Sequence, residues 1–220
     1  MAEKILQHGA EALIILDGNK VIKRRIKKSY RLVQIDEEIR KLRTRSEAKL
    51  LLKASKVIDI PEIKNVDLDS KEISMEFLEG KKLSEYLDSF SLEDQKKICK
   101  MIGKNIARLH DSDIIHGDLT TSNMILIKNG DKMTINDGKR GDKSFKIFFI
   151  DFGLGFSSHK IEDKAVDLHL LRQALEARHF RHWEVLFAEV KQGYSTSKNS
   201  SMVLQQFKKV EARGRYKENY

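Results

Sequence analysis

Three polar residues that could carry phosphoryl-transfer chemistry lie in the second half of the chain. Asp118 and Asn123 stand five positions apart in the polar stretch "HGDLTTSNM", which is flanked by apolar runs. Asp151 follows the apolar run "FFI" and precedes "FGLG". Ionised carboxylates are rarely buried unless they are paired or bind a metal, so packing alone explains these residues poorly. We therefore interpret them as one site that two loops bring together.

The residue types predict a division of roles. Mg²⁺ takes hard oxygen ligands and commonly shares them with phosphate oxygens, so Asn123 and Asp151 are predicted to hold Mg²⁺. Asp118 is then the free carboxylate, placed to orient a hydroxyl or a water for in-line attack on a phosphoryl group. The three residues, in this order, resemble the catalytic Asp, the metal-binding Asn and the metal-binding Asp of the protein-kinase-like superfamily.

That resemblance implies further parts in the first half of the chain. Strand alternation in "NKVIKRRI" places Val21 and Lys23 on one face, as a phosphate-binding lysine requires. Taken alone, Lys23 reads as an ordinary surface lysine, but the motifs downstream favour the catalytic interpretation. Glu47, in the following helix, is its expected ion-pair partner. The backbone of Glu76 and Leu78, at the end of a strand, is expected to contact an adenine ring.

The chain departs from the common protein-kinase pattern, among other places, at the nucleotide loop and at the activation segment. No GxGxxG precedes the lysine; the only loop there is the short "HGAEA", so Gly9, Ala10 and Glu11 are the residues predicted to line the nucleotide site. Nine residues separate Gly153 from Asp163, and no APE motif follows. A peptide-docking activation segment is therefore missing, and we expect no phosphate-switched activation.

Six stretches together resemble one family, and they span nearly the whole chain: "HGAEA", "RTRSEAKLL", "HGDLTTSNM", "DFGLGF", "EDKAVDL" and "RGRY". They resemble the small atypical kinase/ATPase of the KEOPS complex, the PRPK family. This resemblance implies a two-lobed protein that binds ATP and Mg²⁺ and works beside a threonylcarbamoyl transferase and other KEOPS-type subunits. The complex makes N6-threonylcarbamoyladenosine at tRNA position 37.

The resemblance also implies activities and a tRNA contact. Autophosphorylation or weak Ser/Thr kinase activity is implied for the isolated chain, and ATP hydrolysis for the assembled complex. A basic C-terminal tail is implied to help engage tRNA, through Arg213, Arg215 and Lys217.

Charge patterning favours a polyanionic partner independently of the resemblance. The net charge of the 220 residues is +9. Residues 20–56 contain fourteen Lys and Arg against four acidic residues, so the remainder is close to neutral. For any single residue of this stretch, a solvated helix face is the plainer explanation. Two dense basic islands, here and in the tail, favour a partner such as RNA.

Composition predicts a cytoplasmic protein. The lone cysteine, Cys99, cannot form an internal disulfide, which fits a reducing compartment. No apolar stretch approaches the length of a membrane span, and the first residues lack the layout of a signal peptide.

Periodicity and turn signals predict a small β-rich N-lobe and a helical C-lobe. Together with the resemblance of the motifs, this implies an α+β, two-lobed protein-kinase-like fold with a reduced helical C-lobe that lacks a full activation segment. The N-lobe is residues 1–79, with a hairpin at Asp17-Gly18, a basic helix over 34–55 and two strands around Asp69-Ser70. The C-lobe is residues 80–212, with a capping box at Ser91 and short strands around Asn129-Gly130. Residues 136–144 are predicted as a loop, and 213–220 as a basic tail.

The end of the C-lobe is predicted to be helical over 163–179, 180–191 and about 201–212, with Gly214 allowing the last helix to stop. Asp167, in the first of these helices, is interpreted as scaffold. Cys99, in the helix after Ser91, is interpreted as a core filler. His116 is interpreted as a packed histidine that bonds the loop backbone. The remaining assignments concern three aromatic residues expected in the core and two histidines without the neighbours of a zinc site: Trp183, Phe180, Phe187, His179 and His182.

Two rival functions remain open. Small-molecule phosphotransferases also use HGD and a metal-binding Asp, but they usually carry a larger helical lobe than this chain can contain. A non-catalytic scaffold that binds tRNA and partner subunits is the second rival, and the intact set of four polar residues argues against it: Asp118, Asn123, Asp151 and Lys23.

Overall fold

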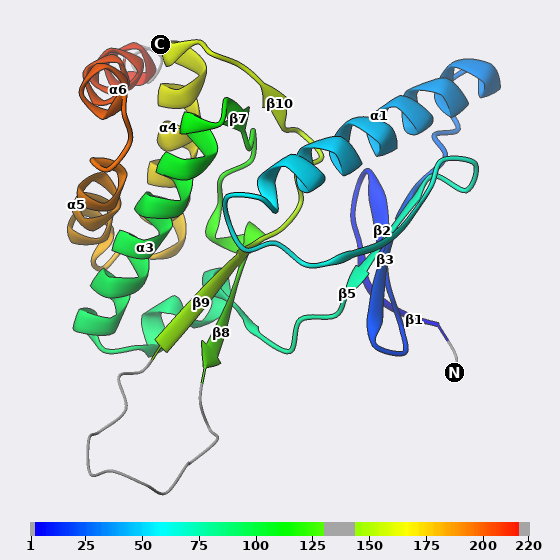
Figure 1. Ribbon diagram of the computed structural model, residues 1–220, viewed down its shortest axis with the longest axis horizontal. Coiled ribbons are helices and arrows are strands. Elements are labelled where there is room, and N and C mark those ends of the chain that lie inside the picture. The colour runs from blue at the N-terminus through cyan, green and yellow to red at the C-terminus, as the bar shows by residue number, and fades with distance from the viewer. Residues whose placement is uncertain (1–2, 130–143, 216–220) are drawn as a thin grey trace, which may run out of the picture.

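The computed structural model describes residues 3–129 and 144–215 and places them in two lobes (Figure 1). A five-stranded antiparallel sheet and one long helix form the N-lobe, and helices with two small sheets form the C-lobe. The fold is the α+β, two-lobed, protein-kinase-like arrangement predicted from the sequence.

The N-lobe sheet has the strand order β1-β2-β3-β5-β4. Its strands are β1 (Lys4–His8), β2 (Ala12–Asp17), β3 (Lys20–Arg25), β4 (Ile63–Asp67) and β5 (Glu72–Glu76). The predicted hairpin is confirmed, since Asp17 pairs with Lys20 across Gly18, whose φ of 63° suits the turn. Strand β1 was not predicted. All five of its residues are exposed, so it lacks the apolar alternation that marks a half-buried strand.

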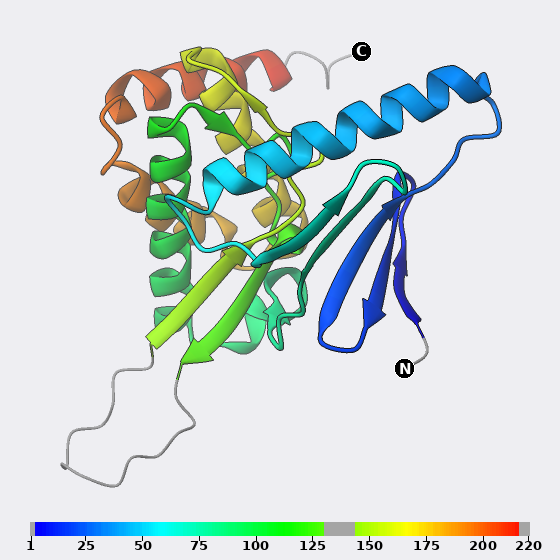
Figure 2. The same ribbon diagram turned by 45° about the vertical axis from the view of Figure 1, so that its right-hand side comes forward.

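Helix α1 (Val33–Ala54) is the predicted basic helix, and its two halves differ in burial. The C-terminal half buries Leu50, Leu51 and Ala54 in the same core cluster as the C-lobe residue Phe152. The N-terminal half extends away from that core (Figure 2), and Ile35 and Leu42 are exposed there. The lobes therefore share a core at the C-terminal end of α1, which fixes the position of that end relative to both.

The linker between the lobes, residues 77–80, connects β5 to the first short strand of the C-lobe. Strand β6 (Lys81–Lys82) pairs with β8 (Met124–Asn129), and β8 pairs with β9 (Ser144–Phe149). The loop predicted over 136–144 lies outside the described residues up to 143. Strands β7 (Ile114–Ile115) and β10 (Phe156–Ser157) form a second small sheet. These short sheets hold the segments on either side of Asp118 and Asp151.

Helix α3 (Leu92–Asp111) is the centre of the C-lobe. The Ser91 hydroxyl accepts a hydrogen bond from the Asp94 N–H (3.2 Å), as the predicted capping box requires. Ile98, Ile102, Ile106 and Leu109 are fully buried, whereas Met101 is only partly buried. Cys99 is fully buried beside them, and burial raises the pKa of its thiol to about 12.

The other C-lobe helices are α2 (Leu83–Tyr86), the 3-10 turns η1 (Leu87–Ser89) and η2 (Thr121–Asn123), α4 (Ile161–Arg178), α5 (Trp183–Tyr194) and α6 (Ser200–Arg215). Helix α5 packs on α3, and α6 packs on α4 (Figure 1). Within the described residues, no helix combines the length and apolar character needed to cross a membrane.

Two sequence assignments at the C-lobe are wrong. Phe180 is 74% exposed, because it lies in the turn between α4 and α5 rather than on a helix face, while Phe187 is buried as predicted. Helix α6 does not stop before Gly214 but continues through it to Arg215. The helix and the tail predicted to begin at residue 213 therefore overlap.

Candidate active site

A cavity of about 620 Å³ lies between the two lobes, a size ordinary for small-molecule sites. Its lining includes every residue predicted from the sequence to bind nucleotide, metal or the nucleophile: Gly9, Ala10, Glu11, Lys23, Glu47, Glu76, Leu78, Asp118, Asn123 and Asp151. The fold therefore brings the ten together from two strands, three loops, the linker and α1.

Lys23 occupies the centre of an ion-pair cluster. Its Nζ lies 2.6 Å from Glu47 Oε1 and 2.6 Å from Asp151 Oδ1, which links the N-lobe sheet, α1 and the C-lobe. The predicted pairing of Lys23 with Glu47 is thus present. The other Glu47 oxygen accepts from Arg25, also buried, at 2.5 Å. Arg25 was not predicted, although alternation along β3 places residues 21, 23 and 25 on one face.

Asp151 is held by charge and by an unusual backbone conformation. Burial by itself raises the pKa of Asp151, but Lys23 and the Gly153 N–H outweigh it, and the pKa lies below its ordinary value. The φ of Asp151 is 64°, in the left-handed region that non-glycine residues seldom adopt. A side chain at Gly153 would bring its Cβ within 2.9 Å of Asp151 Oδ1 and 3.3 Å of Lys23 Nζ. The close approach of this carboxylate to the lysine therefore requires glycine at 153.

Asn123 holds Asp118 through its amide nitrogen. Asn123 Nδ2 donates to Asp118 Oδ2 (2.8 Å) and to the Asp118 backbone carbonyl (3.0 Å). Because both bonds use the nitrogen, the amide oxygen of Asn123 is left as its acceptor. An amide oxygen and the Asp151 carboxylate in one cavity match the donor set that Mg²⁺ prefers.

The protein donors are few, however. Among residues 3–129 and 144–215, no group of three or more His, Cys, Asp or Glu side chains is arranged to hold a metal ion. Two protein oxygens fit a Mg²⁺ that takes most of its ligands from phosphate and water, and they fit a dedicated protein cage poorly.

Buried polar contacts fix the loop that carries Asp118. Asp167 is 1% exposed and accepts hydrogen bonds from the backbone N–H groups of His116 (2.8 Å) and Gly117 (2.9 Å). His116 lies 3.2 Å from the Ile150 carbonyl through Nε2, so Nε2 carries the proton and Nδ1 accepts from the Asp118 N–H (3.3 Å). Burial lowers the pKa of His116, which keeps the ring neutral. The interpretation of both side chains as scaffold is borne out by these contacts.

His179 gives this loop a further support that sequence reasoning missed. It is buried and lies 3.1 Å from the Thr121 hydroxyl through Nε2 and 2.9 Å from Asp88 through Nδ1. Asp88 is a carboxylate neighbour that the sequence did not indicate, because it lies far from His179 in the chain, but one carboxylate does not make a zinc site. The contact with Thr121 ties the end of α4 to the 3-10 turn that carries Asn123, and the contact with Asp88 ties it to η1.

The linker offers a restricted set of backbone groups to the cavity. The Glu76 N–H donates to the Glu62 carbonyl (2.9 Å), and the Leu78 carbonyl accepts from Gly80 (2.9 Å). The predicted adenine contact therefore narrows to the Glu76 carbonyl and the Leu78 N–H.

Of the three residues predicted to contact tRNA, Arg213 lies apart from this site. Arg213 is exposed on α6, does not line the cavity and forms an ion pair with Glu162. Arg215 is the last helical residue, and Lys217 lies outside the described residues.

Comparisons with known proteins agree with this geometry. Residues 15–202 match the protein kinase domain family. The chain is 37% identical over 229 residues to the KEOPS complex subunit Bud32 of Pyrococcus abyssi, with 98% of this chain and 97% of that protein aligned. It is 42% identical over 224 residues to a probable bifunctional tRNA threonylcarbamoyladenosine biosynthesis protein of Methanobrevibacter smithii, and covers only 37% of that longer protein.

Among solved structures, the Rio2 kinase of Chaetomium thermophilum in an ADP/Mg²⁺-phosphoaspartate complex has a TM-score of 0.60 with 15% sequence identity. The alignment covers 97% of this chain and 70% of the kinase. At that identity the likeness establishes the fold alone. Because the kinase-domain match spans most of the chain and the Pyrococcus relative aligns almost end to end, the chain belongs to the family of Bud32-type KEOPS subunits with a protein-kinase-like fold.

Proposed function

We propose that this chain is an atypical Ser/Thr kinase and ATPase that uses ATP and Mg²⁺ to support N6-threonylcarbamoyladenosine synthesis at tRNA position 37. In this proposal it works in the cytoplasm beside a threonylcarbamoyl transferase and other KEOPS-type subunits. The observation that carries the proposal is the convergence of Lys23, Glu47 and Asp151 within 2.6 Å contacts at the cavity that Asp118 and Asn123 also line.

Each side chain has a role that its contacts support. Lys23 lies between two carboxylates and is the cation available to the phosphates of a nucleotide. Asp118 is held through one oxygen by Asn123, so its second oxygen can accept a hydrogen bond from the attacking hydroxyl or water. Asn123 and Asp151 would hold Mg²⁺, which supplies positive charge to the phosphate oxygens when bound.

The exposed basic side chains support the tRNA part of the proposal. Much of the basic stretch is engaged internally, as Arg40 with Asp36 and Arg43 with Glu11 show. Three exposed basic residues remain along one face of α1 at intervals of four, namely Arg45, Lys49 and Lys53. A row of this kind suits contact with a phosphate backbone. The names of the Pyrococcus and Methanobrevibacter relatives point to the same assembly and modification.

The rivals fit the molecule less well. A small-molecule phosphotransferase needs a helical lobe large enough to shape a substrate pocket, whereas the described part of the C-lobe has only four helices longer than one turn, α3 to α6. A non-catalytic scaffold has no need of a left-handed Asp151 held beside a buried lysine.

Phosphate release from ATP in the presence of Mg²⁺, with and without the partner transferase and tRNA, tests the proposal. Asp151→Ala should lower that release by about a hundredfold or more, because it removes a group that stabilises phosphoryl transfer. Lys23 keeps Glu47 as its partner in this variant, so the protein should still fold, with a lower thermal unfolding midpoint because alanine tolerates the φ of 64° less well than aspartate. Unchanged phosphate release from a folded Asp151→Ala protein contradicts the proposal.

A further inference from the structure

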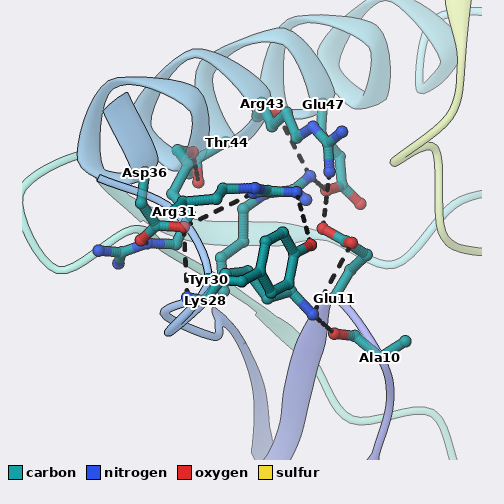
Figure 3. A network of polar contacts seen from close by, with 11 residues as sticks. Ala10, Glu11, Lys28, Tyr30, Arg31, Asp36, Arg43, Thr44 and Glu47 are labelled. Carbon is teal, nitrogen blue, oxygen red and sulfur yellow. Dashed lines mark hydrogen bonds and ion pairs between the residues drawn. The ribbon is translucent and has the colours of Figure 1, made fainter. Parts of the chain in front are cut away.

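The short loop between β1 and β2 is bonded to the middle of α1 and to the segment that precedes this helix (Figure 3). Arg43 Nη1 donates to Glu11 Oε2 at 2.6 Å, and Lys28 Nζ donates to the Ala10 carbonyl. The Ile26 N–H donates to the Glu11 carbonyl at 3.1 Å. Side chains and backbone therefore hold a loop that has no GxGxxG motif to shape it.

The same helix holds the buried lysine. Arg43 and Glu47 are four residues apart on α1, so they lie on one face, a turn from each other. Glu47 accepts from Lys23 and Arg25, and Arg25 also reaches the Arg43 carbonyl (3.4 Å). One face of α1 thus contacts the loop through Arg43 and the lysine through Glu47.

Glu11 is an unexpected residue in a loop that should face a polyanion. Its carboxylate lines the cavity, and by charge alone it would repel the phosphates of a nucleotide. Arg43 at 2.6 Å and Lys28 at 3.9 Å balance that charge. The pairing gives the carboxylate a positioning use that offsets its unfavourable sign.

We propose that Glu11 and Arg43 form a clamp that positions the Gly9–Glu11 loop over the phosphate end of the cavity. Through this clamp, the affinity for nucleotide depends on the position of α1. Glu11 and Arg43 are positioning residues and not catalytic residues. The proposal rests on the proposed function, in that it takes the ligand of the cavity to be a nucleoside triphosphate.

Glu11→Gln separates the clamp from simple electrostatics. Removing a negative charge beside a polyanion site should tighten ATP binding if charge alone matters. If the clamp matters, the same change frees the loop and weakens binding. Arg43→Gln weakens binding in both cases, so the sign of the Glu11→Gln effect decides between them.

The test measures dissociation constants for Mg²⁺-ATP and for adenosine by calorimetry, and KM and kcat for phosphate release. Glu11→Gln and Arg43→Gln should each weaken ATP binding and raise KM about two- to fivefold, the range expected from a partly exposed ion pair. Adenosine affinity and kcat should stay within about twofold of the wild-type values. The double variant should be no worse than either single variant, since the two side chains act as one unit.

Rescue and a matched control complete the test. The charge exchange Glu11→Arg with Arg43→Glu should recover most of the missing ATP affinity. Lys41→Gln removes the same charge from the same helix, outside the cavity lining, where its ion-pair partner is the exposed Asp69, and should leave ATP affinity unchanged. In the protein without nucleotide, amide exchange over residues 9–12 should accelerate in both clamp variants but not in Lys41→Gln.

Three results overturn the clamp: tighter ATP binding by Glu11→Gln, an Arg43→Gln effect that Glu11→Gln does not share, or unchanged ATP binding in both variants. Titration of the wild-type protein with Mg²⁺-ATP comes first, because it distinguishes failure of the clamp from failure of the proposed function. If the wild-type protein binds no ATP, the proposed function fails, and with it the premise of the clamp. If it binds ATP and both variants bind it equally well, the clamp alone fails.

Discussion

At the scale of single residues, the pair Asp118 and Asn123 shows how a short loop can assign different tasks to similar polar groups. Asn123 turns its nitrogen to Asp118 and keeps its oxygen for another partner. Asp118 gives one oxygen to that contact and keeps the other. The hydrogen bond therefore sets the orientation of both side chains before any ligand arrives, which lowers the cost of organising the site later.

Asp118→Asn should retain nucleotide affinity and lose turnover. An asparagine can still offer its oxygen to Asn123, so the loop keeps its geometry, but its amide cannot accept a proton from the nucleophile. Phosphate release should fall by about a hundredfold to ten-thousandfold, the usual range for removal of a general base. Calorimetry and phosphate release measured on one preparation check this. Equal losses of affinity and turnover would instead make Asp118 a ligand or a structural residue.

Sequence reasoning located the residues of the site that stand in recognisable motifs. Asp118, Asn123 and Asp151 could be placed because their order and spacing are local features of the chain. Arg43 and His179 could not, since their partners depend on how distant elements pack. Such contacts leave no signal in a single sequence.

At the scale of elements, the segment between Asp151 and α4 is short and firmly held. Asp113 Oδ1 accepts from Nζ of Lys164, which is 3% exposed, at 3.0 Å. The other oxygen, Asp113 Oδ2, lies 2.8 Å from His159 Nδ1. The Asp113 carbonyl accepts from the Ser158 N–H at 3.1 Å, and the Ser158 hydroxyl bonds Asp163. These contacts hold the segment through side chains and backbone groups of the described residues.

Asp113→Asn should destabilise the protein at neutral pH and alter its response to acid. The hydrogen bond from Lys164, with burial opposing it and His159 adding to it, holds the pKa of Asp113 below its ordinary value. A lowered pKa in the folded state means that the stabilisation is full above about pH 4 and is lost as pH falls through the folded-state pKa. The substitution keeps a residue that tolerates the φ of 55°.

Urea unfolding from pH 7 to pH 3 measures this effect. The variant should lose about 1–3 kcal/mol at pH 7, because Lys164 is left buried without its carboxylate. It should then lose less stability than the wild type on acidification. Asp69→Asn is the matched control, since the Asp69 side chain is 95% exposed and its ion pair with Lys41 is long, at 3.5 Å. This variant should change the free energy of unfolding little. A parallel acid response of the wild type and Asp113→Asn would contradict the assignment.

The helices and strands were predictable where a turn signal or the spacing of apolar residues marks them in the sequence. The hairpin at Gly18, α1 and the capped helix α3 all carry such patterns, and the structure contains them. Strand β1 carries none, because its only sheet partner among the described residues is β2 and both its faces are open. Gly214 was expected to end α6, but one glycine costs a helix only about 1 kcal/mol, and the helix continues to Arg215.

At the scale of the whole molecule, the exposed row Arg45, Lys49 and Lys53 on α1 and the exposed Arg213 on α6 do not line the cavity. A triple change of Arg213, Arg215 and Lys217 to Gln should weaken tRNA affinity and leave ATP affinity unchanged. Each side chain that no longer neutralises a phosphate should flatten the dependence of log affinity on log salt by about 0.7 to 0.9. Charge changes are preferable to truncation, because Arg213 and Arg215 belong to α6.

Binding of tRNA to the assembled complex across a salt series checks this. Lys97, Lys104 and Arg108 changed to Gln form a control of equal charge, since all three are exposed on α3. Equal affinity and equal salt slope in the Arg213, Arg215 and Lys217 variant would remove the end of α6 from the tRNA interface.

Because Cys99 is buried, its reaction with a thiol reagent reports how often the C-lobe opens. As the single thiol of the sequence, fully enclosed beside Ile98 and Ile102, it can react with a thiol reagent only in molecules whose C-lobe has opened. A ligand that binds only closed molecules makes opened ones rarer. Mg²⁺-ATP should therefore slow the labelling of Cys99. The labelling rate of this one buried thiol then measures occupancy of the cavity without any catalytic turnover.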